Sequence, residues 1–158
     1  MNILFIMYDQ LRFDYLSCAG HPTLKTPNFD RVAARGVRFT NCYVQSPICG
    51  PSRMSTYTGR YVRSHGALWN GHPLQVGEMT LGDHLRPLGV RTALCGKTHM
   101  CADLAGMERL GIDPNSARGT LMREGGFEVW DRDDGVVRDG AKKQQSHCNK
   151  YLNEAGYE

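Results

Sequence analysis

The sequence of 158 residues lacks a long hydrophobic run. The longest apolar stretch near its start, residues 3–7, is far shorter than the roughly 20 residues that a membrane-spanning helix needs. It also has no basic flank, and it is too short for the hydrophobic part of a signal peptide. We therefore expect a cytoplasmic protein that does not enter a membrane.

Long runs of one charge are also missing. The chain carries 19 Lys and Arg against 16 Asp and Glu, for a net charge of +3, and its longest basic run is the pair at residues 142–143. Nucleic-acid-binding proteins gather basic side chains into a patch or stripe, so we expect no nucleic-acid partner. A small positive net charge is compatible with a small anionic substrate.

Paired cysteines are absent as well. The six cysteines form no Cys-x-x-Cys pair and have no His-x-x-x-His partner, which excludes a zinc ribbon or a thioredoxin-type site. In a cytoplasmic protein we expect them to be free thiols. The six are Cys18, Cys42, Cys49, Cys95, Cys101 and Cys148.

Strand and helix patterns alternate along the first hundred residues. Apolar stretches predict strands at residues 2–8, 37–44 and 90–95. Proline and cap residues predict helices that begin at Pro27, Pro51 and Thr80 and end near residues 35, 59 and 88. This alternation predicts an α/β fold, a doubly wound and mostly parallel sheet with helices on both faces.

The rest of the chain is less periodic. Residues 101–145 are rich in Gly, Asp and Arg, and we expect a loop-rich insertion there, with a short strand at residues 127–130. A final helix is predicted over residues 147–155. With its length and 41% apolar residues, the chain has enough material for one domain with a core.

Polar residues follow several of the predicted strands. Asp9 ends the first strand, Cys49 lies in a loop that follows another, and Lys97 and His99 follow the strand at residues 90–95. Ligands bind beyond the carboxyl ends of parallel strands, so these groups are expected to converge on one sheet edge. Asp9 there is either a ligand for a hard cation or a turn residue.

Cys49 and Arg53 stand four residues apart, which places them on one side of a helix. A thiol at a helix N-terminus has a lowered pKa, and a guanidinium binds sulfate or phosphate with two parallel hydrogen bonds. The alternatives are a buried structural cysteine and a solvated arginine.

Lys97, His99 and Asn70 are further candidates for substrate binding. Lys97 and His99 are two residues apart, so on extended backbone they point the same way. An ammonium and an imidazole suit an ester oxygen that gains charge, while the alternative is a polar loop. Asn70 either donates hydrogen bonds to a substrate or forms a turn.

Four motifs together resemble a known family. Residues 49–53 read Cys-Gly-Pro-Ser-Arg and are followed by Thr-Gly-Arg-Tyr at 58–61. Thr-Pro-Asn-Phe-Asp at 26–30 and Gly-Lys-Thr-His at 96–99 stand in the same order. The chain resembles the N-terminal part of a type I sulfatase, in the alkaline phosphatase superfamily. The resemblance is strong over residues 1–100 and loose beyond them.

The resemblance implies a modified nucleophile and a metal. A maturating enzyme would oxidise Cys49 to formylglycine, whose hydrated form attacks the sulfur of a sulfate ester and later expels sulfate. A divalent cation, calcium or alternatively manganese, would be held by Asp9 and residue 49. Arg53 would hold the formylglycine hydroxyl, while Lys97 and His99 would bind sulfate and ester oxygens.

Some residues depart from the sulfatase pattern. Many sulfatases have two aspartates where this chain has Asp9-Gln10, and this pair and the segment before Asn70 resemble the phosphonate monoester hydrolase and choline-sulfatase-like branch. Lys97 and His99 match sulfatases. A phosphonate monoester or phosphodiester hydrolase, and a non-catalytic anion-binding α/β module, therefore stay open.

Length is the other departure, because family members run to several hundred residues. Their remaining metal ligands lie far downstream, and Asp133 and Asp134 do not fit that role. We expect residues 1–158 to be the N-terminal part of a single catalytic domain, a fragment that is inactive alone. A homo-oligomer is possible for the whole protein.

Overall fold

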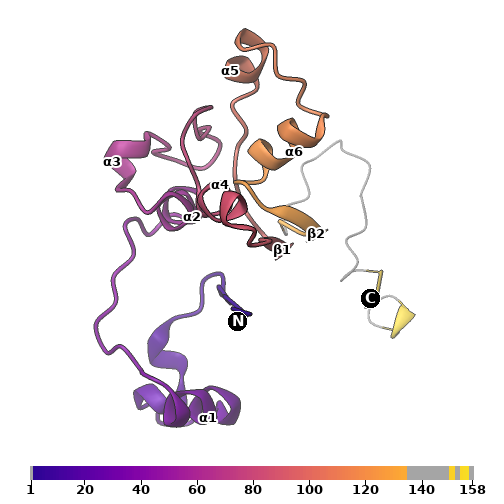
Figure 1. Ribbon diagram of the computed structural model, residues 1–158. Coiled ribbons are helices and arrows are strands. Elements are labelled where there is room, and N and C mark those ends of the chain that lie inside the picture. Colours follow the sequence, from indigo (N-terminus) through magenta and orange to yellow (C-terminus); the bar gives the residue numbers. More distant parts are fainter. Residues whose placement is uncertain (1, 135–149, 152–153, 157–158) are drawn as a thin grey trace. The chain divides into compact units, whose positions relative to one another are not determined.

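The computed structural model describes residues 2–134, 150–151 and 154–156. The chain divides into two compact units, Met1–Tyr43 and Val44–Glu158 (Figure 1). Each unit is described by itself. Whether both belong to one catalytic domain stays a prediction.

The first unit is built around one α-helix. The helix α1 (Pro27–Arg35) begins with proline at its first position, as predicted, and follows two short 3₁₀ helices, η1 (Phe13–Tyr15) and η2 (Ser17–Ala19). The Ser17 hydroxyl ties η2 to α1, because it donates to an Asp30 carboxylate oxygen at 2.7 Å and accepts from the Thr26 backbone N–H at 2.8 Å.

Two predicted strands, at residues 2–8 and 37–44, are not strands in the structure. Their apolar side chains are exposed; Ile3 and Val37 are each 82% exposed. A strand forms only when a neighbouring strand completes its backbone hydrogen bonds. Within the described part of the chain, the sheet contains two strands from elsewhere in the sequence, so these two predictions are wrong.

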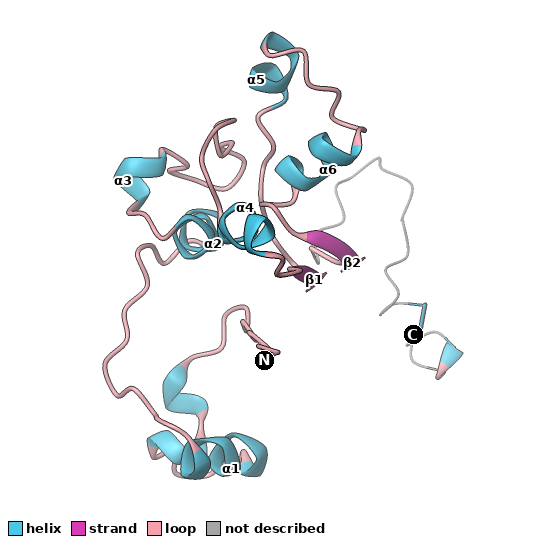
Figure 2. Ribbon diagram, viewed as in Figure 1, coloured by secondary structure: helices cyan, strands magenta, loops and turns pink. Residues whose placement is uncertain are grey.

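The second unit holds the remaining elements (Figure 2). They are α2 (Cys49–Thr58), α3 (Val62–His65), α4 (Leu81–Leu85), η3 (Arg86–Leu88), β1 (Ala93–Gly96), α5 (Leu104–Arg109), α6 (Ala117–Arg123) and β2 (Glu128–Arg132). None of the helices that the structure describes is long and apolar enough to cross a membrane. The five cysteines in the described residues are free, and Cys148 lies outside them.

The expected loop-rich insertion at residues 101–145 contains two helices, α5 and α6, within its described part. Each is capped by a side chain, since Asp103 accepts from the Gly106 N–H at 2.9 Å and Ser116 from the Gly119 N–H at 3.0 Å. Short polar residues at these positions favour helix starts. The sequence did not predict these two helices. Residues 135–145, like most of the helix predicted at 147–155, lie outside the described residues, so the loop-rich insertion stays a prediction.

The strands β1 and β2 form a parallel pair, as the predicted parallel sheet requires. Both strands lie close to their predicted positions. The pairing runs from Ala93 with Glu128 to Gly96 with Arg132, with an irregularity between Leu94 and Cys95. The carboxyl ends of the two strands therefore lie side by side.

A small apolar core lies under α2. Met54 and Tyr57 of this helix pack with Ala67 and Leu74, and all four are buried. The ring of Phe127 meets Tyr57 edge to face, with centroids 5.2 Å apart. This core holds the helix that carries Cys49 against the loop before β2.

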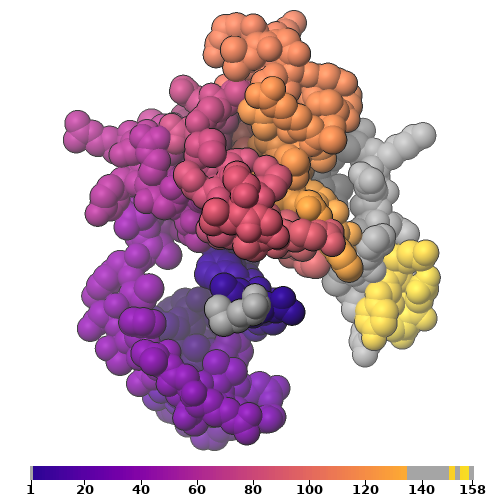
Figure 3. All heavy atoms as spheres, viewed as in Figure 1, coloured from indigo at the N-terminus to yellow at the C-terminus, as the bar shows by residue number. Residues whose placement is uncertain are grey.

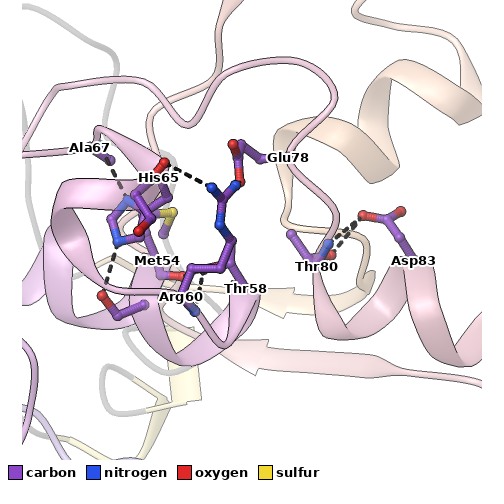
Figure 4. Close-up of polar contacts among 10 residues, drawn as sticks. Met54, Thr58, Arg60, His65, Ala67, Glu78, Thr80 and Asp83 are labelled. Atoms are coloured by element: carbon purple, nitrogen blue, oxygen red, sulfur yellow. Dashed lines mark hydrogen bonds and ion pairs between the residues drawn. The ribbon is translucent and has the colours of Figure 1, made fainter.

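The N-terminus of α4 is fixed by polar contacts. Thr80 and Asp83 form the reciprocal capping box of Figure 4, and the Thr80 hydroxyl also donates to the Gly125 carbonyl at 2.6 Å. The backbone of Gly126 lies so close that a side chain at Gly82 would place its Cβ 2.1 Å from the Gly126 carbonyl oxygen. In Figure 3, the red segment that contains α4 touches the orange segment that leads into β2.

We predict that Gly82→Ala destabilises the second unit. Alanine normally favours a helix over glycine by about 1 kcal/mol. Here its methyl group meets backbone that must move, so we expect a net loss of about 1–3 kcal/mol in the free energy of unfolding. Urea denaturation measures it, with the exposed neighbour His84→Ala as control. A Gly82→Ala protein as stable as the wild type would contradict the close packing.

A buried hydrogen-bond chain ties α2 to the loop after α3 (Figure 4). The Ala67 N–H donates to Nδ1 of His65 at 3.2 Å, and Nε2 of His65 lies 2.9 Å from the Ser55 hydroxyl oxygen. Since an N–H can only donate, Nδ1 must be an acceptor, and the neutral ring carries its proton on Nε2. Burial lowers the pKa of His65.

We predict that His65 makes stability fall in acid. An unfolded histidine has a pKa of about 6.5, so below that pH the unfolded chain binds a proton that the folded one refuses. The contribution is fully present above pH 6.5 and is lost as pH falls toward the lowered folded pKa. Between pH 7.5 and 5, the free energy of unfolding from urea denaturation is expected to drop more in the wild type than in His65→Gln, by up to ~1.4 kcal/mol per pH unit. His84→Gln is the control variant. Equal losses of stability in the wild type and in His65→Gln would disprove the prediction.

Candidate active site

Cys49 is the first residue of α2 and is half-buried. The sequence predicted a helix start at Pro51; the helix begins two residues earlier, so the thiol lies inside its first turn. The first turn of a helix presents unpaired N–H groups and a partial positive charge, which favour an anion. Residue 49 is thus placed where a negatively charged group is stabilised.

Arg53 lies one turn further along α2 and is only 5% exposed. Its Nη1 donates to the Lys97 carbonyl oxygen at 2.8 Å. A solvated arginine, the alternative left open above, is therefore wrong. Burial raises the pKa of the Tyr57 phenol, and the charge of Arg53 opposes the rise. A permanent positive charge is thus held inside the unit, close to the end of β1.

Asn70 contacts the start of α2 directly. Its Oδ1 accepts from the Gly50 N–H at 2.8 Å, and its Nδ2 lies 3.5 Å from Sγ of Cys49. The close approach needs glycine, because a Cβ at residue 50 would lie 2.7 Å from Oδ1. The structure brings Asn70 and Cys49 together, while the substrate contact proposed for Asn70 stays a prediction.

Lys97, Thr98 and His99 follow β1 at the carboxyl end of the sheet. Lys97 and His99 are half-buried, and Thr98 between them is fully buried. The backbone at His99 is left-handed, with φ of 50°. This conformation costs a non-glycine residue about 1–2 kcal/mol. Since the backbone at His99 is not extended, the side chains of Lys97 and His99 are not aligned by strand alternation as the sequence predicted.

A charged network lies behind His99, and the sequence analysis missed it. The Asp134 carboxylate accepts from the His99 N–H at 3.0 Å and from both terminal nitrogens of Arg132 at 2.7 and 2.6 Å. Nε of Arg132 lies 3.1 Å from the Glu124 carboxylate. Burial raises the pKa of Glu124, and the charge of Arg132 opposes the rise.

No local sequence pattern predicts this charged network. Glu124, Arg132 and Asp134 lie 25 or more residues after His99 in sequence, since the separation to Glu124 is 124 − 99 = 25. From the sequence, Asp134 was weighed only as a metal ligand, a role that its position does not fit. Its carboxylate instead binds the His99 backbone N–H and the Arg132 guanidinium.

Asp9 lies in the first unit, next to Tyr8, whose ring packs against Phe29 with centroids 5.3 Å apart. A carboxylate and the oxygens of a modified residue 49 are of the kind that hard cations prefer. Among the described residues, however, no three His, Cys, Asp or Glu side chains gather around a possible metal position. Donor type therefore fits a metal, and the pairing of Asp9 with residue 49 stays a prediction.

These contacts define what the second unit can do. Asn70 meets Cys49, Arg53 shares a helix face with Cys49, and Arg53 holds the carbonyl of Lys97. A helix N-terminus, a buried guanidinium and an ammonium are the groups that bind a tetrahedral oxyanion. The arrangement suits sulfate, phosphate and phosphonate groups.

Comparison with solved structures supports the fold. The crystal structure of the phosphonate monoester hydrolase of Agrobacterium radiobacter matches 94% of this chain and 27% of its own, with a TM-score of 0.69 and 32% identity. The chain therefore has the alkaline phosphatase-like α/β fold. The described residues form only a two-stranded part of its sheet, so the doubly wound arrangement with helices on both faces stays a prediction.

Comparison with curated proteins finds sulfatases. An N-acetylglucosamine-6-O-sulfatase of Bacteroides thetaiotaomicron is 34% identical over 70% of this chain and 20% of its own length. Arylsulfatase A of Homo sapiens is 38% identical over 73% of this chain and 22% of its own. The chain thus spans about a fifth of these relatives. The family model described as "Sulfatase" matches residues 1–114, and the chain belongs to the sulfatase family.

Proposed function

We propose that the protein containing this chain hydrolyses sulfate esters at a formylglycine derived from Cys49. The contact pattern at the start of α2 carries the proposal. Cys49 lies in the first turn, Asn70 is bonded to that turn, and Arg53 is buried one turn away with its charge beside the end of β1. The maturating enzyme and a small sulfate ester are the partners that this proposal needs.

Formylglycine would supply a geminal diol, which takes up the sulfuryl group and releases it again as the aldehyde is restored. The surrounding residues bind and orient. Arg53 neutralises charge near residue 49, and the Asn70 amide holds the first turn of α2 in place. Lys97 would bind sulfate oxygens, and the His99 imidazole would give a proton to the ester oxygen as the alcohol leaves.

A divalent metal, calcium or manganese, belongs to the same proposal. When bound, it would polarise sulfate oxygens. Asp9 and residue 49 are the proposed ligands in this chain. Since the described residues do not gather enough donors, the proposal assigns no step to the metal.

A phosphonate monoester hydrolase is the second candidate. Two observations favour it: the structural match to such an enzyme, and Gln10 beside Asp9 in place of a second carboxylate. Lys97 and His99 favour the sulfatase. A non-catalytic anion-binding module is the third candidate, and it has no need of a modified Cys49.

The first prediction of this proposal concerns Cys49. When the full-length protein is produced together with a maturating enzyme, its intact mass is expected to fall by the difference between CH₂SH and CHO. The matured protein is expected to hydrolyse an aryl sulfate faster than an aryl phosphonate. Cys49→Ala is expected to show neither the mass change nor turnover.

The outcomes separate the three candidates. Faster turnover of the phosphonate would replace the sulfatase with the second candidate. An unmodified Cys49 after successful maturation of a control sulfatase in the same cells, with no turnover of either ester, would leave the binding module. The same assay on the 158-residue chain alone is expected to show no activity.

The second prediction concerns Asn70. Asn70→Asp keeps an oxygen that can accept from the Gly50 N–H but adds a negative charge near residue 49, whereas Asn70→Ala removes the acceptor. A charge near a bound anion costs more than a neutral hydrogen bond, so we expect KM for the sulfate ester to rise at least about tenfold more in Asn70→Asp than in Asn70→Ala.

Steady-state kinetics of the two matured variants measure the difference. Asn115→Asp, an exposed position, is the control for the added charge. If Asn70→Asp binds the ester as well as Asn70→Ala does, Asn70 does not face the substrate anion.

A further inference from the structure

The two strand ends continue side by side beyond the sheet. The Asp133 N–H donates to the Gly96 carbonyl at 3.0 Å, so pairing extends past β2. The irregularity between Leu94 and Cys95 advances β2 by one residue, which places Arg132 rather than Asp131 opposite Gly96. The residues that follow, 97–99 on one side and Asp134 on the other, therefore meet at the carboxyl edge.

Asp134 is held rigidly at this edge. Each of its carboxylate oxygens accepts from one terminal nitrogen of Arg132, at 2.7 and 2.6 Å. Arg132 is in turn fixed by Glu124, 3.1 Å from its Nε. Because a paired guanidinium and carboxylate are planar and share two bonds, Asp134 cannot turn away from His99 without breaking them.

The segment at residues 97–99 is held at both ends. Arg53 bonds to the Lys97 carbonyl oxygen at 2.8 Å, and Asp134 accepts from the His99 N–H at 3.0 Å. Thr98 between them is fully buried. His99 has the left-handed backbone that side-chain-bearing residues avoid, so an added contact is needed to keep it there.

We propose that Asp134, fixed by Arg132 and Glu124, is a positioning residue for His99. By holding the His99 N–H it keeps the backbone left-handed, and this sets the direction in which the imidazole leaves the chain. Asp134 acts through His99 and does not touch the ester itself. The inference rests on the proposed function, in which His99 gives a proton to the leaving oxygen.

A plain structural role is the competing explanation, in which Asp134 and Arg132 only tie the end of β2. The chain offers a matched control for it. Arg91 and Glu128 form an ion pair of 2.6 Å at the amino ends of the same two strands. If strand pairing were all that matters, loss of either pair would have the same effect on residues 97–99.

Amide hydrogen exchange of His99 tests the contact without any need for activity. In the full-length protein, Asp134→Ala is expected to speed exchange at His99 roughly tenfold, because a hydrogen bond to a charged acceptor is lost. Asp134→Asn keeps an acceptor oxygen and is expected to show a smaller change. Glu128→Ala is expected to leave His99 unchanged.

Kinetics test the consequence for catalysis in the matured protein. Asp134→Ala is expected to lower kcat about tenfold for an alkyl sulfate, whose leaving alkoxide needs a proton, and less for a nitrophenyl sulfate, whose phenolate does not. KM is expected to change less than about twofold. The kcat of Asp134→Asn is expected to lie between those of the wild type and Asp134→Ala.

Several outcomes overturn the proposal. They are unchanged exchange at His99 in Asp134→Ala, an equal loss of kcat for both esters, and the same effects in Glu128→Ala. If the wild type hydrolyses neither ester, the proposed function fails. The exchange experiment then still decides whether Asp134 holds His99.

Discussion

The buried charge of Arg53 is the constraint on which the candidate site depends. A guanidinium that is 5% exposed must keep its hydrogen bonds, since burying an unpaired charge costs several kcal/mol. Its bond to the Lys97 carbonyl satisfies part of this need and joins α2 to the end of β1. Residue 49, one turn earlier on the same helix, is thereby placed against the residues that follow the strand. The same contacts therefore fix the position of Cys49 and satisfy the buried charge of Arg53.

Apolar packing and hydrogen bonds to backbone groups have different roles in this arrangement. The apolar face of α2, Met54 and Tyr57, packs on Ala67 and Leu74 and fixes where the helix lies. Polar contacts to backbone groups fix how its functional end is presented: Asn70 to Gly50, and Arg53 to Lys97. Apolar contact is non-directional, whereas a hydrogen bond sets an angle. A site that must aim several groups at one anion therefore relies on the second kind, with the core as its support.

The sequence predicted those parts of the two units that depend on neighbouring residues in the chain. Proline and cap residues were enough to predict α1, α4 and the helix that carries Arg53, although α2 begins at Cys49, two residues before the predicted start. The contact between Asp134 and His99 was not predicted from the sequence. It depends on a one-residue irregularity in the pairing of β1 and β2, which no local sequence pattern encodes. The strands predicted at residues 2–8 and 37–44 failed for the opposite reason. Their apolar patterns are suited to a sheet, but a strand also needs a hydrogen-bonded partner strand, and neither segment has one within its own unit among the described residues.

The choice between sulfate and phosphonate follows from donor geometry more than from charge. A sulfate monoester and a phosphonate monoester each carry one negative charge near neutral pH, so Arg53 and Lys97 attract both. They differ at one position, where sulfate presents a third non-bridging oxygen and phosphonate presents carbon. A donor aimed at that position is satisfied by sulfate and left unpaired by phosphonate, and an unpaired buried donor costs about 1–3 kcal/mol. Under the proposed function, preference for sulfate grows with the number of donors held in fixed directions, and residues 97–99, held at both ends, are proposed to supply such donors.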